Sequence, residues 1–161
     1  MGEVRIKVRL VNAVDEALAR RGQLPPERVR IYETEALVDT GAVRCALPPF
    51  VADQLGLARV ARYMAQYADG RLEEVDLTEG FVLEVLGRRT TEEALVLGDE
   101  VLIGQTALEK LDLVVDCQRR ALVPNPAHPD QPVSKVKFAL GRHKGLLLQT
   151  ADSSAVANCS L

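Results

Sequence analysis

The chain has no tryptophan, and it has no serine before Ser134. It has only two histidines, His128 and His143, and both follow residue 127. The lack of serine argues against a Gly-x-Ser-x-Gly hydrolase, and the scarcity of histidine argues against a histidine-ligated metal site. A glycine-rich phosphate loop is also missing. We therefore expect neither a metal nor an organic cofactor.

Long apolar runs and a concentrated basic face are missing as well. No apolar run approaches the length of a membrane span, and the N-terminus has no signal-peptide core. The 20 basic and 23 acidic residues are well mixed, which argues against a nucleic-acid partner. The three cysteines form neither a zinc pattern nor a disulfide framework. We expect a cytoplasmic protein with reduced cysteines and no nucleic-acid or membrane partner.

The composition is 47% hydrophobic but only 4% aromatic, so we expect aliphatic β-branched side chains to fill the core. A length of 161 residues fits one domain, and we assign this domain to residues 1–126. Four prolines lie between positions 124 and 132. They separate the domain from residues 127–161, which we predict to be a partly mobile C-terminal extension.

Most of the local signals are those of strands. Alternating apolar residues predict a strand at 3–11. Two long strands, 59–68 and 71–86, are predicted to form a hairpin around Asp69-Gly70. Further strands are predicted at 29–38, 92–97, 101–104 and 112–116, with a possible last one at 133–140. Short helices are predicted near 50–55 and 105–111, and residues 13–22 are predicted to be a short helix or a loop.

The most informative segment is residues 36–42, which read Ala-Leu-Val-Asp-Thr-Gly-Ala. Asp39 stands at the end of an apolar, strand-forming run, and Gly41 permits a turn with torsions closed to other residues. We therefore expect the carboxylate to be held where a buried strand turns, close to backbone N–H groups. A carboxylate held in this way suits acid–base work on water.

This motif resembles the active-site strand of the retropepsin-like aspartic proteases, which are single-domain relatives of pepsin. In that family an apolar-apolar-glycine strand lies beside the catalytic strand, leads into a short helix and is followed by another strand. Residues 101–104, 105–111 and 112–116 have this order. The resemblance covers roughly residues 31–126. It implies a mainly β fold, namely a closed β-barrel with one or two short helices.

The resemblance also implies a homodimeric aspartic endopeptidase that hydrolyses peptide bonds. The chain has one such motif, so the second carboxylate must come from Asp39 of a second copy. Two such carboxylates share a proton and activate a water between them. Thr40 is expected to hydrogen-bond across the dimer interface, and Gly41, Ala42 and Gly104 to support the site.

The hairpin tip at Tyr67, Asp69 and Gly70 falls where the family has a flap that closes over bound peptide. Two departures from the family are visible. The tip is charged and has little glycine, and Gln105-Thr106 stand where many viral relatives have Arg followed by Asp or Asn. A catalytically silent retropepsin-fold module for peptide binding or assembly is therefore the alternative. The sequence does not identify the substrate.

Overall fold

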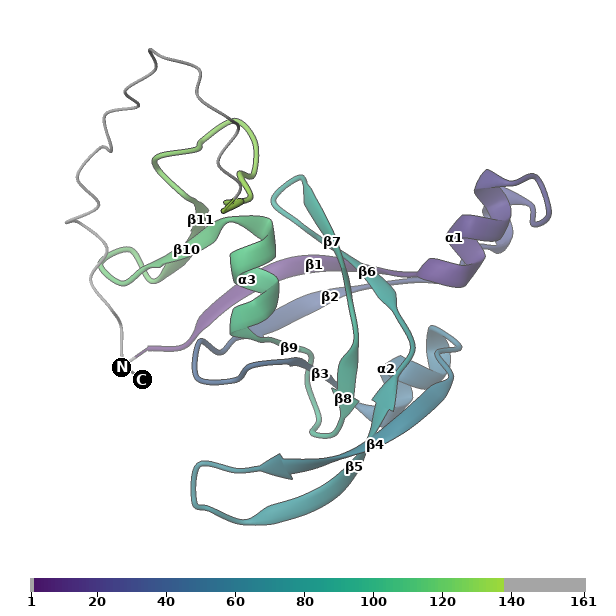
Figure 1. Ribbon diagram of the computed structural model, residues 1–161, viewed down its shortest axis with the longest axis horizontal. Coiled ribbons are helices and arrows are strands. Elements are labelled where there is room, and N and C mark those ends of the chain that lie inside the picture. The colour runs from purple at the N-terminus through teal and green to yellow at the C-terminus, as the bar shows by residue number, and fades with distance from the viewer. Residues whose placement is uncertain (1, 138–161) are drawn as a thin grey trace.

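The computed structural model describes residues 2–137, and strands predominate in it (Figure 1). Within these residues, nine strands form one mixed sheet and two more form a separate pair. The large sheet consists of β1 (Val4–Asn12), β2 (Ile31–Val38), β3 (Cys45–Leu47), β4 (Arg59–Gln66), β5 (Leu72–Thr78), β6 (Phe81–Val85), β7 (Arg88–Glu92), β8 (Ala94–Val96) and β9 (Leu102–Ile103). The separate pair is β10 (Leu113–Asp116) and β11 (Ala121–Pro124). The helices are α1 (Ala13–Arg20), α2 (Pro49–Gln54) and α3 (Gln105–Leu111), with a 3₁₀ turn, η1, at Pro26–Arg28.

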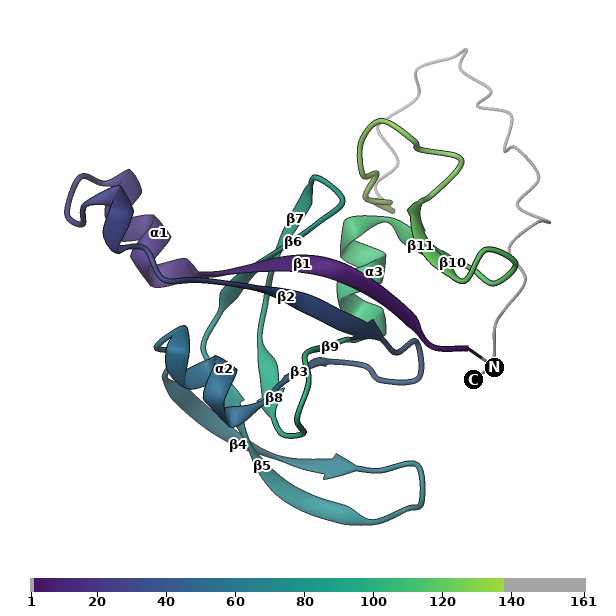
Figure 2. The same ribbon diagram turned by 180° about the vertical axis from the view of Figure 1, so that it is seen from behind.

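The large sheet is open, so the expected closed β-barrel is wrong, although the fold is mainly β as expected. The strand order is β4-β5-β8-β3-β9-β2-β1-β6-β7, and within the described residues the two edge strands, β4 and β7, do not pair with each other. Two junctions in the sheet rest on one register pair each, Leu77 with Leu95 and Ala46 with Leu102. Such short junctions let the β4–β5 hairpin diverge from the rest of the sheet instead of closing onto β7 (Figures 1 and 2).

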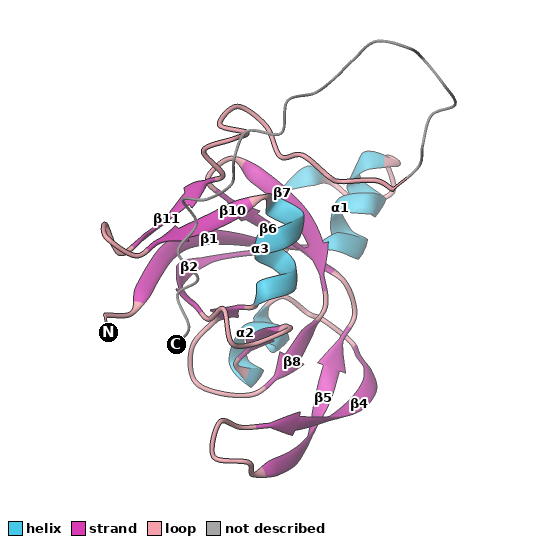
Figure 3. Ribbon diagram, turned by 60° about the vertical axis from the view of Figure 1, so that its left-hand side comes forward, coloured by secondary structure: helices cyan, strands magenta, loops and turns pink. Residues whose placement is uncertain are grey.

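Aliphatic side chains fill the core, but leucine contributes at least as many of them as valine and isoleucine together, so the expectation of a β-branched core is only partly right. Phe81 and Leu10 are among the largest fully buried side chains, and most of the others are leucine, isoleucine or valine. The helices α2 and α3 lie against the strands (Figure 3) and add Val51 and Leu111 to this cluster. Burial of each such side chain is worth about 1.5–3 kcal/mol.

Most of the predicted strands are present with shifted ends, but the single strand predicted over 71–86 is wrong. It is divided at residues 79 and 80 into β5 and β6. A tight turn at Leu86 and Gly87, which both have positive φ, then leads into β7, which sequence analysis missed. Residues 132–137 are not in a strand, so the strand predicted from Val133 is absent there, and its last residues lie outside the described part.

Candidate active site

Asp39 follows the last residue of β2 and is fixed by a strand that is distant in sequence. Its backbone N–H donates to the carbonyl oxygen of Ile103 at 3.0 Å. The strands β2 and β9 run parallel, with Leu37 opposite Leu102 and Val38 opposite Ile103. The prediction that the glycine-ended strand lies beside the Asp39 strand is therefore confirmed.

The strand β9 is inserted between β2 and β3, the two strands that the Asp39 turn connects. The helix α3 starts one residue after β9, and its first two backbone N–H groups donate hydrogen bonds to carbonyl oxygens of the turn. The N–H of Gln105 donates to the carbonyl of Ala42 at 2.7 Å, and that of Thr106 donates to the carbonyl of Val43 at 3.2 Å. The turn is therefore held along its length by backbone bonds from β9 and α3.

Two predicted glycines lie within this arrangement, for reasons that differ in part from the expected ones. The N–H of Gly41 donates to Oδ1 of Asp39 at 2.9 Å. Gly41 is not among the glycines with positive φ, so the expectation that it needs torsions closed to other residues is wrong. A Cβ on Gly104 would lie 2.4 Å from the carbonyl oxygen of Arg44 and 3.0 Å from that of Ala42. Gly104 is thus required for close backbone approach, as predicted.

Asp39 and Thr40 are both half-buried and line a cavity of about 380 Å³. The other residues around it are Gly2, Glu3, Val4, Leu37, Val38, Val115, Cys117 and Arg120. Valine and leucine side chains make much of this wall apolar. The cavity places an apolar surface directly beside the carboxylate.

The cysteines only partly match the expectation of reduced thiols. Cys45 is a free thiol in the core, and burial raises its pKa to about 11. Cys117, beside the cavity, does not carry a free thiol. The expectation is therefore wrong for Cys117.

The hairpin predicted around Asp69 and Gly70 is present as the β4–β5 connection. Gly70 has a φ of 86°, and its N–H donates to the carbonyl of Tyr67 at 2.9 Å. The hydroxyl of Tyr67 donates to Glu73 at 2.5 Å, and this bond raises the pKa of Tyr67. The guanidinium of Arg71 lies 4.3 Å from the centre of the same ring. The tip is therefore braced by its own side chains.

The structure brings the predicted residues together in two groups. Asp39, Thr40, Gly41, Ala42 and Gly104 lie in one turn and its support. Tyr67, Asp69 and Gly70 lie in the hairpin tip, which projects to the same side of the molecule as the turn between β2 and β3 (Figures 1 and 2). Within residues 2–137, no hydrogen bond joins the tip to the turn.

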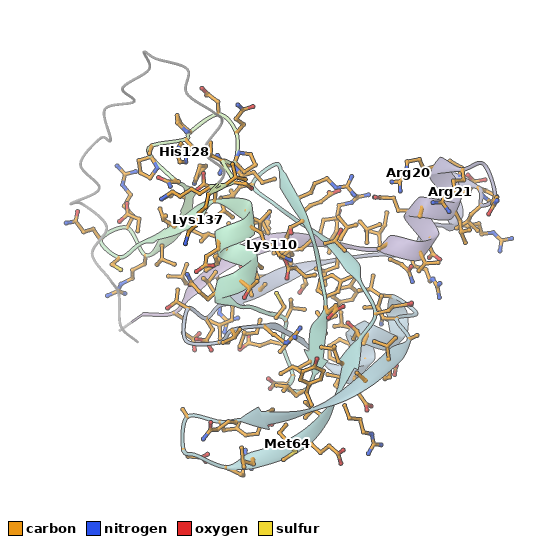
Figure 4. The ribbon with its side chains drawn as sticks, in the orientation of Figure 1. Arg20, Arg21, Met64, Lys110, His128 and Lys137 are labelled. Atoms are coloured by element: carbon orange, nitrogen blue, oxygen red, sulfur yellow. The ribbon has the colours of Figure 1, made fainter. Side chains whose placement is uncertain are left out.

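A polar cluster at the C-terminal end of α3 was missed by sequence analysis. Asp112 has a φ of 53° and accepts from Asn125 at 2.9 Å and from the N–H of Val133 at 3.1 Å. Its Oδ2 lies 2.6 Å from Nδ1 of His128, which is labelled in Figure 4. Burial raises the pKa of Asp112, but the hydrogen bonds from Asn125, Val133 and His128 outweigh it and leave the pKa lowered.

Arg88 completes this cluster from the edge strand β7. Its guanidinium donates to the carbonyls of Leu111 at 2.9 Å, Asp112 at 2.7 Å and His128 at 2.6 Å. The end of α3 is therefore tied both to β7 and to residues 125–133. No short sequence signal points to this cluster, because its members are far apart in the chain.

The part of the chain that the structure describes has no helix long and apolar enough to cross a membrane. It also contains no group of three or more histidine, cysteine or acidic side chains that could hold a metal ion. A comparison of the chain with models of protein families finds no match, and a comparison with curated proteins finds none either.

Proposed function

We propose that the protein is a homodimeric aspartic endopeptidase of the retropepsin-like type. The observation that carries the proposal is the setting of Asp39. Its N–H is bound to Ile103 in the inserted strand β9, and its carboxylate accepts the N–H of Gly41. A carboxylate oriented by backbone groups on rigid elements is suited to general acid–base catalysis.

The mechanism requires Asp39 from two copies of the chain. Two carboxylates that face each other share one proton, because both cannot ionise at short range. The ionised carboxylate takes a proton from water as the water oxygen attacks the peptide carbonyl carbon. The protonated carboxyl donates a hydrogen bond to the carbonyl oxygen. Collapse of the tetrahedral intermediate then breaks the C–N bond, and the amine leaves with the proton that the first carboxylate had taken from water.

The cavity beside Asp39 supports a dimer at this face. Thr40 and the apolar residues Val4, Leu37 and Val115 line it, and removal of apolar surface from water favours association. A two-fold axis through this face brings Asp39 and Thr40 of both copies together. Thr40 then contacts its counterpart below the two carboxylates.

The alternative is a catalytically silent module that binds peptides or mediates assembly. One observation favours it, namely the bracing of the hairpin tip by Tyr67, Glu73 and Arg71. A lid closes over substrate and contacts it, whereas these side chains already contact one another within the hairpin.

In either case the proposed partner is a peptide or protein in extended form. The expected cytoplasmic location stays a prediction from the sequence. Its argument from reduced cysteines no longer holds, because Cys117 does not carry a free thiol.

Cleavage of a diverse peptide library, with products identified by mass spectrometry, tests the proposal. The wild type should cleave, and Asp39→Asn and Asp39→Ala should not, although both should stay folded by circular dichroism. Asp116→Asn is a matched control, since Asp116 is the last residue of β10 and, like Asp39, accepts the backbone N–H two residues later, at 3.0 Å. It should cleave like the wild type. Equal cleavage by the wild type and both Asp39 variants would refute the endopeptidase, whereas binding without cleavage by the wild type would favour the alternative.

A further inference from the structure

Arg44 lies in the same turn as Asp39, just before β3. Its backbone is fixed by the close approach of Gly104, where an added Cβ would meet the carbonyl oxygen of Arg44 at 2.4 Å. The start of this side chain is therefore held in place relative to the carboxylate. The guanidinium at the other end of the side chain contacts Tyr63 and Glu93, which lie outside the turn.

The guanidinium of Arg44 lies 5.0 Å from the centre of the Tyr63 ring. Its Nη1 is also 3.4 Å from Oε2 of Glu93, between β7 and β8. Tyr63 belongs to β4 and stands opposite the buried Val75, so it lies on the inner face of the hairpin. One side chain thus connects the Asp39 turn with the hairpin.

This connection matters because, in the described part of the chain, the other attachments of the hairpin lie at its base, where Arg59 pairs with Asp53 and Thr78 accepts the N–H of Ala94. The strand β5 joins the rest of the sheet through the register pair Leu77 and Leu95, and β4 is an edge strand. Most residues of β4 are exposed. Arg62 lies on the outer face, and its ionic partners, Glu74 at 3.4 Å and Asp76 at 3.6 Å, belong to the hairpin itself.

We propose that Arg44 is a positioning residue that sets the place of the β4–β5 hairpin relative to the Asp39 turn. The inference rests on the proposed endopeptidase function and adds to it a determinant of substrate binding. A cation over an exposed aromatic ring and a half-exposed ion pair are each weak. Together they favour one position of the hairpin relative to the Asp39 turn. The conformational entropy that is lost when the hairpin becomes ordered around a bound peptide is therefore smaller.

The first arm of the test measures the contact without any peptide. The natural chain has no tryptophan, so Tyr63→Trp introduces a single tryptophan, which can be excited selectively and keeps an aromatic face for Arg44. Acrylamide quenching of this tryptophan should increase when Arg44→Gln is added and should stay nearly unchanged with Arg44→Lys. Arg62→Gln removes the same charge from the outer face and should leave quenching unchanged. Equal quenching with Arg44 and with Arg44→Gln would overturn the inference.

The second arm uses the chain with its natural tyrosine and a peptide that the wild type cleaves. Arg44→Gln should raise KM about two- to fivefold, with little change in kcat, because a weak positioning contact is lost and the carboxylates are untouched. Arg44→Lys should restore most of the binding, and Arg62→Gln should behave like the wild type. An unchanged KM in an active enzyme would overturn the inference. A chain that cleaves no peptide would refute the proposed function, while the quenching arm would still decide whether Arg44 holds the hairpin.

Discussion

The Asp39 turn and the hairpin tip share a local motif but differ in what surrounds it. In both, an aspartate oxygen accepts the backbone N–H two residues later at 2.9 Å, from Gly41 in the turn and from Arg71 in the tip. The Asp39 turn is also bound by β9 and α3, whereas the tip, among residues 2–137, bonds only within its own hairpin. The comparison shows that the local motif is enough to form a turn. Holding the aspartate in a fixed position also requires backbone bonds from elements that are distant in sequence.

The two regions should therefore differ in local stability. Each backbone hydrogen bond contributes about 0.5–1.5 kcal/mol, and those of the Asp39 turn break only if β9 or α3 moves. The tip can open without disturbing the sheet, since most of its residues are exposed. Regions with few buried contacts open at low free energy. The following predictions test this difference, from the largest expected effect to the smallest.

The largest effect is expected at Gly104. Its replacement by alanine places a Cβ 2.4 Å from the carbonyl oxygen of Arg44, and backbone cannot move aside as a flexible side chain can. We expect Gly104→Ala to lower the free energy of unfolding by about 2–3 kcal/mol. Gly70→Ala at the tip meets only open space, although its φ of 86° is strained, and should cost about 1 kcal/mol. Urea denaturation measures both, and equal losses would remove the distinction between the regions.

The second prediction tests whether the Asp39 turn acts in pairs. Wild type mixed with a ninefold excess of Asp39→Asn should lose activity per wild-type chain by about tenfold, because random pairing leaves few wild-type dimers. Mixing with Asp116→Asn in the same ratio should leave the activity per total chain unchanged. Activity that follows simple dilution by Asp39→Asn, together with a monomeric mass, would refute the two-chain site.

The third prediction concerns pH and the far end of α3. The pKa of Asp112 is lowered in the folded protein, so its contribution to stability is present above the unfolded pKa. That contribution is lost as pH falls from about 4 through the folded pKa. Asp112→Asn should therefore lower the free energy of unfolding at neutral pH by about 1 kcal/mol relative to the wild type. This difference between the two proteins should become smaller in acid. Urea denaturation at several pH values checks this, and a constant difference would contradict it.

The smallest effect is expected at the tip. Tyr67→Phe removes the hydroxyl that donates to Glu73 but keeps the ring under Arg71. Because the bond is exposed, the free energy of unfolding should fall by less than about 0.5 kcal/mol. Thermal unfolding monitored by circular dichroism is the measurement. If Tyr67→Phe lowered the free energy of unfolding as much as Gly104→Ala does, the tip would contribute to the stability of the whole fold.

The sequence predicts those features that are encoded by a short motif or by a pair of such motifs. The Asp39 turn, its neighbour β9 and the close approach at Gly104 follow from two short motifs, and the Asp69-Gly70 hairpin follows from its turn residues. The prediction of a closed barrel was wrong, because closure depends on whether the edge strands β4 and β7 pair, and no local sequence signal reports on that pairing. The contacts of Arg44 and Asp112 were missed for a related reason. Each joins side chains that only tertiary packing brings together.

The insertion of β9 between β2 and β3 also sets the order in which the molecule can assemble. Val38 pairs with Ile103, so much of the chain must be made before the strand next to Asp39 exists. Closing such a long loop is entropically costly, and parallel pairing of distant strands is slow. A nascent chain that has reached only α2 can pair β2 with β1 as far as Val38, but it lacks β9 and α3, which hold the turn after Val38. The geometry described for the Asp39 turn can therefore form only after synthesis has passed the start of α3.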